Sequence, residues 1–157
     1  MRHRFDTKRT VIMSRSDDGA RIAALRCDPD STMSSIAQLP FSEATTLTSM
    51  ALETAKAELT QSRSGVPTVI MVVTDGLPLS EKKTKKVATK IKATDGVRLM
   101  MVPVSGHGMT ADGVSFMTEL ASMPKEDNMK SIDSFDTLNQ ISTIDMFVAG
   151  ACPSIGN

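Results

Sequence analysis

The chain of 157 residues contains no tryptophan and no tyrosine, and aromatic side chains make up only 3% of it. Such side chains are the usual stacking platforms for nucleic-acid bases, so their absence argues against that class of partner. The net charge is zero, from 18 basic and 18 acidic residues. Without an excess of positive charge, we expect neither nucleic acid nor an anionic membrane surface as a partner.

Three further absences concern membranes, cysteine chemistry and nucleotide binding. No apolar run is long enough to cross a bilayer, so we expect no direct membrane insertion. The basic residues 1–4 lead into a polar segment, so no signal peptide is visible. Cys27 and Cys152 are the only cysteines, and their spacing fits neither a metal site nor a disulfide scaffold. No glycine-rich nucleotide loop or nucleophile elbow occurs, which counts against several enzyme classes.

The most informative stretch is an apolar, β-branched run at residues 69–74, which ends abruptly at Asp75-Gly76. A run without alternation is typical of a strand covered on both faces of a parallel sheet. The pattern therefore places the Asp75 carboxylate at the carboxyl end of a central strand. In open α/β sheets that edge is where ligands bind.

The rest of the pattern predicts an α/β domain. An Asp-Gly turn between two short apolar runs predicts an antiparallel hairpin, and from residue 49 onward helices and strands alternate, which predicts a parallel sheet with helices on both faces. Pro103 is unfavourable within a central strand, because proline cannot donate a hydrogen bond to a neighbouring strand. Expected strands are 9–14, 20–25, 69–74, 97–104 and 128–132; expected helices are 31–39, 49–61, 80–93, 111–123 and 135–149, the last ended by Gly150.

Two motifs on the predicted rim carry a resemblance to the von Willebrand factor type A (vWA) domain. One is Thr-x-Thr-x-x-Ala-Leu at residues 46–52, and the other is Thr-Asp-Gly at residues 74–76. Among members of this family, the Asp-Gly-Leu-Pro turn and the cysteine near residue 152 are most similar to the thrombospondin-related adhesive proteins of apicomplexan parasites. The resemblance implies a Rossmann-like fold, a mostly parallel sheet with an antiparallel edge hairpin, and an extracellular or cell-surface location.

The resemblance also implies a metal-ion-dependent adhesion site, with Thr46 and Asp75 as ligands of Mg²⁺ or Mn²⁺. Both ions accept oxygen ligands, and open positions in their shell can be filled by an acidic side chain of a partner protein. We expect Thr48, Gly76, Leu77 and His107 on the rim that contacts this partner, with Thr48 also capping the helix that follows.

The chain departs from the family pattern at one point, because it contains no Asp-x-Ser-x-Ser loop. The interpretation is that the first strand and helix of the family are missing, through a fragment, an incomplete gene model or divergence. The expected organisation is a flexible segment at residues 1–8, a truncated vWA domain at 9–152 and a tail at 153–157. Without the missing loop, the metal site is incomplete and the ion need not be bound.

We therefore expect an adhesion or protein-interaction module that performs no catalysis. Two alternatives stay open from the residues alone. One is a doubly wound α/β enzyme with Asp75 as its active-site acid, and the other is a structural fragment that binds nothing.

Overall fold

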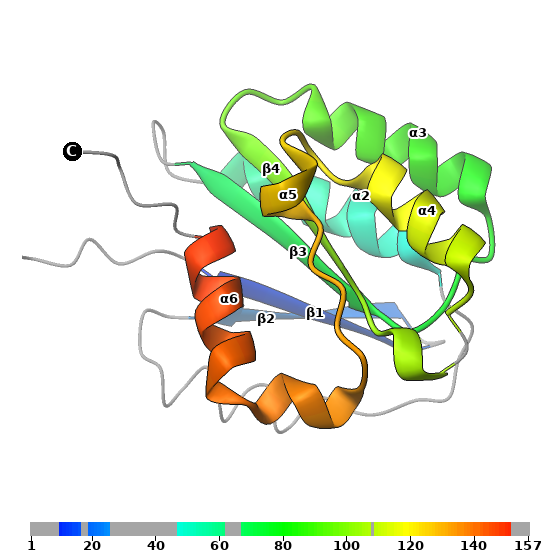
Figure 1. Ribbon diagram of the computed structural model, residues 1–157. Coiled ribbons are helices and arrows are strands. Elements are labelled where there is room, and N and C mark those ends of the chain that lie inside the picture. Colours follow the sequence, from blue (N-terminus) through cyan, green and yellow to red (C-terminus); the bar gives the residue numbers. More distant parts are fainter. Residues whose placement is uncertain (1–9, 17–18, 26–46, 62–66, 108, 152–157) are drawn as a thin grey trace, which may run out of the picture.

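The computed structural model describes residues 10–16, 19–25, 47–61, 67–107 and 109–151 (Figure 1). The expected helix at 31–39, the flexible segment at 1–8, the tail at 153–157 and both cysteines lie outside these ranges. The described elements follow one another in this order: β1 (Thr10–Ser16), β2 (Gly19–Leu25), α2 (Thr48–Glu58), η1 (Leu59–Gln61), β3 (Thr68–Thr74), α3 (Glu81–Lys92), β4 (Val97–Pro103), η2 (Ser105–His107), α4 (Ala111–Leu120), α5 (Lys125–Asn128), η3 (Phe135–Asn139) and α6 (Ile141–Ala151).

The strands form two separate two-stranded sheets. β3 and β4 are parallel, in a register that runs from Thr68 opposite Val97 to Thr74 opposite Pro103. β1 and β2 form the antiparallel hairpin that the Asp-Gly turn predicts. The hairpin was expected at the edge of one continuous sheet, but no described strand joins it to β3 by backbone hydrogen bonds. This separation is what the interpretation of a missing first strand predicts, because that strand would lie between the hairpin and β3.

Local signals explain where the two central helices begin. The Ser80 hydroxyl accepts a hydrogen bond from the Lys83 N–H at 3.4 Å, and the Thr110 hydroxyl accepts one from the Gly113 N–H at 3.2 Å. Each hydroxyl satisfies one of the N–H groups that the first turn of a helix leaves without a partner. After α3, Gly96 turns the chain into β4 with a φ of 72°, a conformation that glycine adopts without strain.

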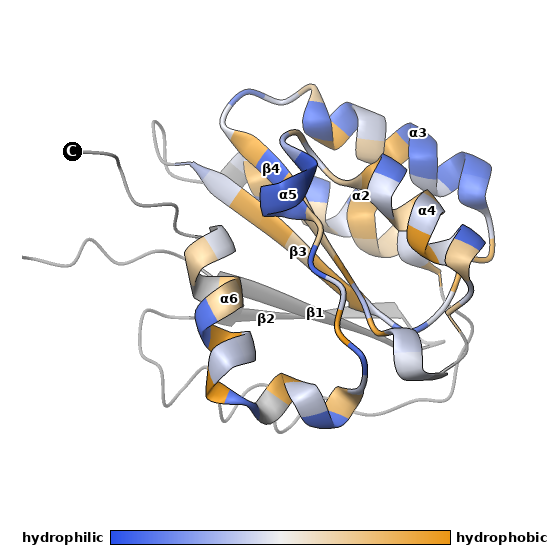
Figure 2. Cartoon of the chain, in the orientation of Figure 1, coloured by the Kyte–Doolittle hydropathy of each residue, from blue (hydrophilic) through white to orange (hydrophobic). Residues whose placement is uncertain are grey.

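The core lies on both faces of β4, whose side chains alternate between two apolar clusters. Figure 2 shows the apolar residues along β3 and β4. Leu99 and Met101 pack on one face with residues of α2, α3 and α4. Met100, Val102 and Val104 pack on the other with Ile132 and with residues of η3 and α6. The prediction of helices on both faces of a parallel pair is therefore confirmed.

β3 differs from the expectation of a strand covered on both faces. Ile70 and Val72 pack against the cluster that contains α2, α3 and α4. On the other face, Val69 contacts the cluster beneath α6, but Met71 and Val73 are 36% and 44% exposed. The apolar run therefore marks the strand correctly and overstates its burial, because the described elements on the α6 side cover β4 and only the beginning of β3.

The expected strand at 128–132 is present only as two isolated parallel bridges, Met101 to Met129 and Val104 to Ile132. The N–H of Ile132 donates to the Pro103 carbonyl oxygen at 3.0 Å, so Pro103 faces this segment. Because proline has no N–H, it cannot return the hydrogen bond that a continuous ladder requires at this position. Pro103 thus ends β4 and interrupts its pairing on one side.

Two helix boundaries also differ from the prediction. α4 stops at Leu120 because Ala121 adopts an extended conformation, which leads the chain towards Pro124. The last helix is divided at Gln140 into the 3₁₀ segment η3 and α6. Gly150 lies inside α6 instead of ending it, and a Cβ there would lie 2.5 Å from the Met100 Cε, so glycine permits close packing on β4.

We expect Leu99→Ala to lower the free energy of unfolding by about 2–5 kcal/mol, because Leu99 is fully buried in the core. Leu79→Ala makes the same substitution at a side chain that is 68% exposed, and its effect should stay within about 0.5 kcal/mol. Urea denaturation followed by circular dichroism measures both. Equal effects of the two substitutions would contradict the assigned core.

Candidate functional site

The carboxyl end of β3 is a tight turn centred on Asp75. The buried Thr74 hydroxyl donates a hydrogen bond to the Gly76 carbonyl oxygen at 3.1 Å and accepts one from the Gly76 N–H at 3.4 Å. These two bonds fold the chain back across a single residue. Asp75, the residue between them, is exposed. The predicted position of this carboxylate, at the carboxyl end of the strand, is confirmed, and the structure adds that it is open to solvent.

The residues after this turn extend the rim towards the start of α4. A Cβ on Gly113 would lie 3.4 Å from the Leu77 Cδ2 and 2.6 Å from the Met109 Sδ, so these side chains pack against the helix. Leu77 is nevertheless 41% exposed, and Leu79 is 68% exposed. The expected rim residues Gly76 and Leu77 therefore lie next to Asp75 with accessible surface.

The end of β4 brings a second loop to the same edge. The Ser105 N–H and hydroxyl both donate to the Ile132 carbonyl oxygen, at 2.8 and 3.0 Å. Gly106 then passes so close to the chain that a Cβ would lie 2.2 Å from the Asp133 carbonyl oxygen. His107 is the last residue of η2, so its backbone lies in this loop.

Asp133 is a carboxylate that the sequence did not single out as a site residue. It is exposed and directly follows Ile132, which pairs with the end of β4. The available signal in the sequence is its position directly after the expected strand at 128–132. Because β3, β4 and the segment at 129–132 run parallel, Asp75 and Asp133 occupy the same edge of the structure.

The start of α2 lies at this edge as well (Figure 1). Leu47 is the residue that precedes the helix, and it makes no side-chain capping bond. Thr48 was expected to cap the helix, but it is the first helical residue, and its exposed fraction is 5%. The small exposed surface of Thr48 restricts direct contact with a partner. Thr46, the expected hydroxyl ligand, lies outside the described residues.

The donors at this edge suit a hard cation but do not enclose one. Asp75 and Asp133 offer carboxylate oxygens, which Mg²⁺ and Mn²⁺ prefer. Within the described ranges, no group of three or more His, Cys, Asp or Glu side chains is placed to hold a metal ion. An ion held here by Asp75 would therefore take most of its ligands from hydroxyls, water or another molecule.

Comparison with known families identifies the class of this domain. The family model of the von Willebrand factor type A domain matches residues 10–144. This match spans most of the chain, and the chain therefore belongs to the vWA family. Comparison with curated proteins gave no match.

Among solved structures, the chain is similar to the manganese-loaded TRAP protein of Plasmodium vivax. The TM-score is 0.57, and the sequence identity is 21%. The likeness covers 72% of this chain and 46% of that chain, so it spans about half the length of that protein. At this identity the comparison establishes the shared fold. In the part of the chain that is described, no helix has the length and apolar character needed to cross a membrane.

Gly106→Ala is expected to destabilise the domain by about 1–3 kcal/mol, because the added methyl group would clash with the Asp133 backbone. Ser115→Ala, on the exposed surface of α4, adds no buried volume and should change stability by less than about 0.5 kcal/mol. Thermal unfolding by differential scanning calorimetry checks the pair. Wild-type stability of Gly106→Ala would show that the two rim loops are not in contact.

Proposed function

We propose that this domain is a protein-interaction module of the adhesive type, which binds a partner protein at the rim around Asp75. A divalent ion, Mg²⁺ or Mn²⁺, is held there by Asp75 and Thr46. The partner completes the coordination shell with an acidic side chain. The domain acts outside the cell or at its surface, and it catalyses no reaction.

The observation that carries the proposal is the exposed Asp75 carboxylate at the carboxyl end of a parallel strand, fixed by the Thr74–Gly76 turn. In open α/β sheets this edge is the ligand-binding edge. Membership of the vWA family supports the same edge, and the similar TRAP protein of Plasmodium vivax is described as manganese-loaded.

The small number of carboxylates favours a bridging ion over a resident structural one. A divalent ion with one or two protein carboxylates keeps residual positive charge and exchangeable water positions. An acidic group on a partner then binds with a more favourable free energy than it would at a site whose charge the domain had already neutralised. The missing Asp-x-Ser-x-Ser loop weakens the site in the free domain and makes its occupancy depend more strongly on the partner.

Family membership favours this proposal over the two alternatives from the sequence. An α/β enzyme with Asp75 as its acid would need further groups that act on a substrate. Among the described residues, the rim supplies hydroxyls, two exposed leucines and a second carboxylate. The second alternative is a fragment that binds nothing. The melting experiment with Mn²⁺ and Mg²⁺, described next, distinguishes it from the proposal.

We expect Mn²⁺ to raise the melting temperature of the wild-type domain, because an ion that binds only the folded state stabilises it by mass action. At a concentration about 100 times the dissociation constant, the gain is about 2.7 kcal/mol. Asp75→Asn keeps the shape of the side chain and removes its charge, so most of this gain should be lost. Differential scanning fluorimetry over a series of Mn²⁺ and Mg²⁺ concentrations measures the shifts.

Asp95→Asn is the matched control, because Asp95 is also an exposed carboxylate but lies in the turn before β4, at the opposite edge. This variant should respond to Mn²⁺ as the wild type does. The metal bridge is refuted if wild-type protein shows no shift, or if Asp75→Asn retains the full one.

A further inference from the structure

A hollow lies at the edge of the parallel pair opposite Asp75, where β4 begins. Its volume is about 390 Å³, and it is formed by the end of α3, the start of β4 and the segment between α4 and α5. The residues that line it include Lys92, Val97, Arg98, Ser122, Met123 and Lys125. No acidic residue is among the described residues that line this hollow.

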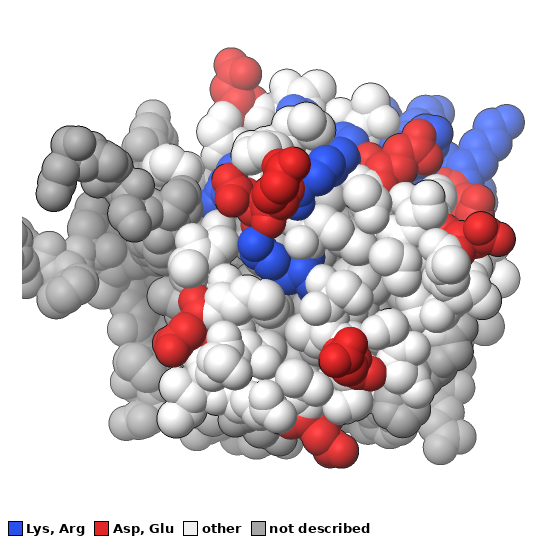
Figure 3. All heavy atoms as spheres, in the orientation of Figure 1, with Lys and Arg blue, Asp and Glu red and all other residues white. Residues whose placement is uncertain are grey.

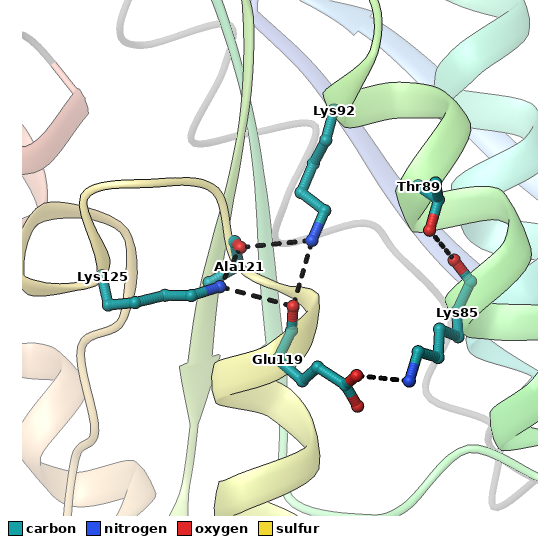
Figure 4. Close-up of polar contacts among 6 residues, drawn as sticks. All are labelled: Lys85, Thr89, Lys92, Glu119, Ala121 and Lys125. Carbon is teal, nitrogen blue, oxygen red and sulfur yellow. Dashed lines mark hydrogen bonds and ion pairs between the residues drawn. The ribbon is translucent and has the colours of Figure 1, made fainter.

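Two lysines from different elements line this hollow, and Figure 4 shows them meeting at the carbonyl oxygens of Glu119 and Ala121. The Lys92 Nζ donates to the carbonyl oxygens of Glu119 and Ala121, at 3.0 and 3.5 Å. The Lys125 Nζ donates to the same Glu119 oxygen at 3.3 Å and also to the Ala121 oxygen. The last carbonyls of α4 thus hold two ammonium groups close together at the wall of one hollow.

These carbonyl partners orient the two charges but do not neutralise them. The end of a helix carries about half an elementary negative charge, against two positive charges on the lysines. The carboxylate of Glu119 forms an ion pair with Lys85 on α3. The pKa of Lys92 is lowered, first by burial and then by repulsion from Lys125, although Glu119 opposes the shift. The side chains that line the hollow are therefore positively charged overall, and Glu119, outside the lining, compensates this charge only in part.

The wider surface around the hollow carries charged side chains of both signs. Figure 3 shows basic and acidic side chains gathered over the upper part of the molecule, around α3, α5 and the end of α4. Elsewhere on that face, acidic side chains stand singly among uncharged ones. Since the whole chain has no net charge, attraction of an anion must arise from such a local cluster.

We propose that this hollow binds a small tetrahedral dianion of the phosphate class, with Lys92 and Lys125 as its charged ligands. The anion is held between the two ammonium groups and relieves their mutual repulsion. Arg98 borders the hollow with its guanidinium fixed by the Asn128 side chain at 3.3 Å and the Gly150 carbonyl oxygen at 2.9 Å. The site is separate from the rim at Asp75, so its occupancy does not require a divalent ion.

Titration of the ¹⁵N-labelled domain with inorganic phosphate at pH 8 tests the proposal, with sodium chloride used to keep the ionic strength constant. We expect saturable shifts of the backbone amides that border the hollow, at Val97, Ser122 and Lys125. Lys92→Gln and Lys125→Gln should each weaken binding by about tenfold or more, as loss of one charge-assisted hydrogen bond implies.

Lys86→Gln is the matched control, because Lys86 lies on the exposed surface of α3 and does not line the hollow. It should bind phosphate as the wild type does, and Lys92→Arg should retain most of the affinity because it keeps the charge. The dispersion of the same spectra shows whether each variant is folded. If either Lys92→Gln or Lys125→Gln does not fold, the phosphate affinity of the other variant tests the site.

A parallel titration with phenyl phosphate distinguishes a free phosphate from a phosphate monoester. Binding of both identifies the terminal phosphate group as the recognised element, and binding of inorganic phosphate alone identifies the free ion. Shifts that grow linearly with concentration, that chloride reproduces, or that persist in the folded double variant Lys92→Gln/Lys125→Gln would overturn the site.

Discussion

The structure depends on the parallel ladder between β3 and β4, and above all on the burial of β4. Every residue from Leu99 to Val104 is buried, and its side chains alternate between the two apolar clusters. A strand enclosed in this way must satisfy its backbone groups through its neighbours, because water does not reach them. The pairing with β3, the bridges to the segment at 129–132 and the bond from the Leu99 N–H to the Ser122 hydroxyl at 2.9 Å fulfil this need.

This ladder also decides where chemistry can occur. In a parallel pair with helical crossovers, the strand ends gather at one edge and the strand beginnings at the other. The first edge carries Asp75, Asp133 and the exposed leucines. The second carries Lys92 of α3 and Lys125 of α5, which meet at the end of α4. The two edges differ in the charged groups they offer, and the strands that separate them are apolar. The two proposed sites would therefore not compete for the same ligand.

The sequence predicted the elements of this scaffold well because their signals are local. The run at residues 69–74 with the turn at Asp75-Gly76, the cap at Ser80 and the turn at Gly96 each depend on neighbouring residues only. Burial was predicted less well. Met71 and Val73 are as apolar as the residues of β4, and their exposure depends on which helices cover that face, which no short window of sequence contains.

The site was predicted only in part, for a similar reason. Asp75 follows from the strand and turn pattern, and the family resemblance supplied Thr46, which lies outside the described residues. Asp133 was missed because its place on the rim follows from the bridge between Val104 and Ile132, about 28 residues apart, and not from a local motif. The lysine cluster was missed because Lys92 and Lys125 meet only after α4 has returned the chain to the beginning of β4.

The interruption at Pro103 gives the domain a graded order of opening. On one side of β4, a continuous ladder ties it to β3; on the other, only two bridges hold the segment at 129–132. Segments held by few backbone bonds open locally at a lower cost in free energy than continuous ladders do. The pairing at 129–132 is therefore expected to open more easily than the ladder between β3 and β4, and the packing of η3 and α6 on β4 opposes this opening.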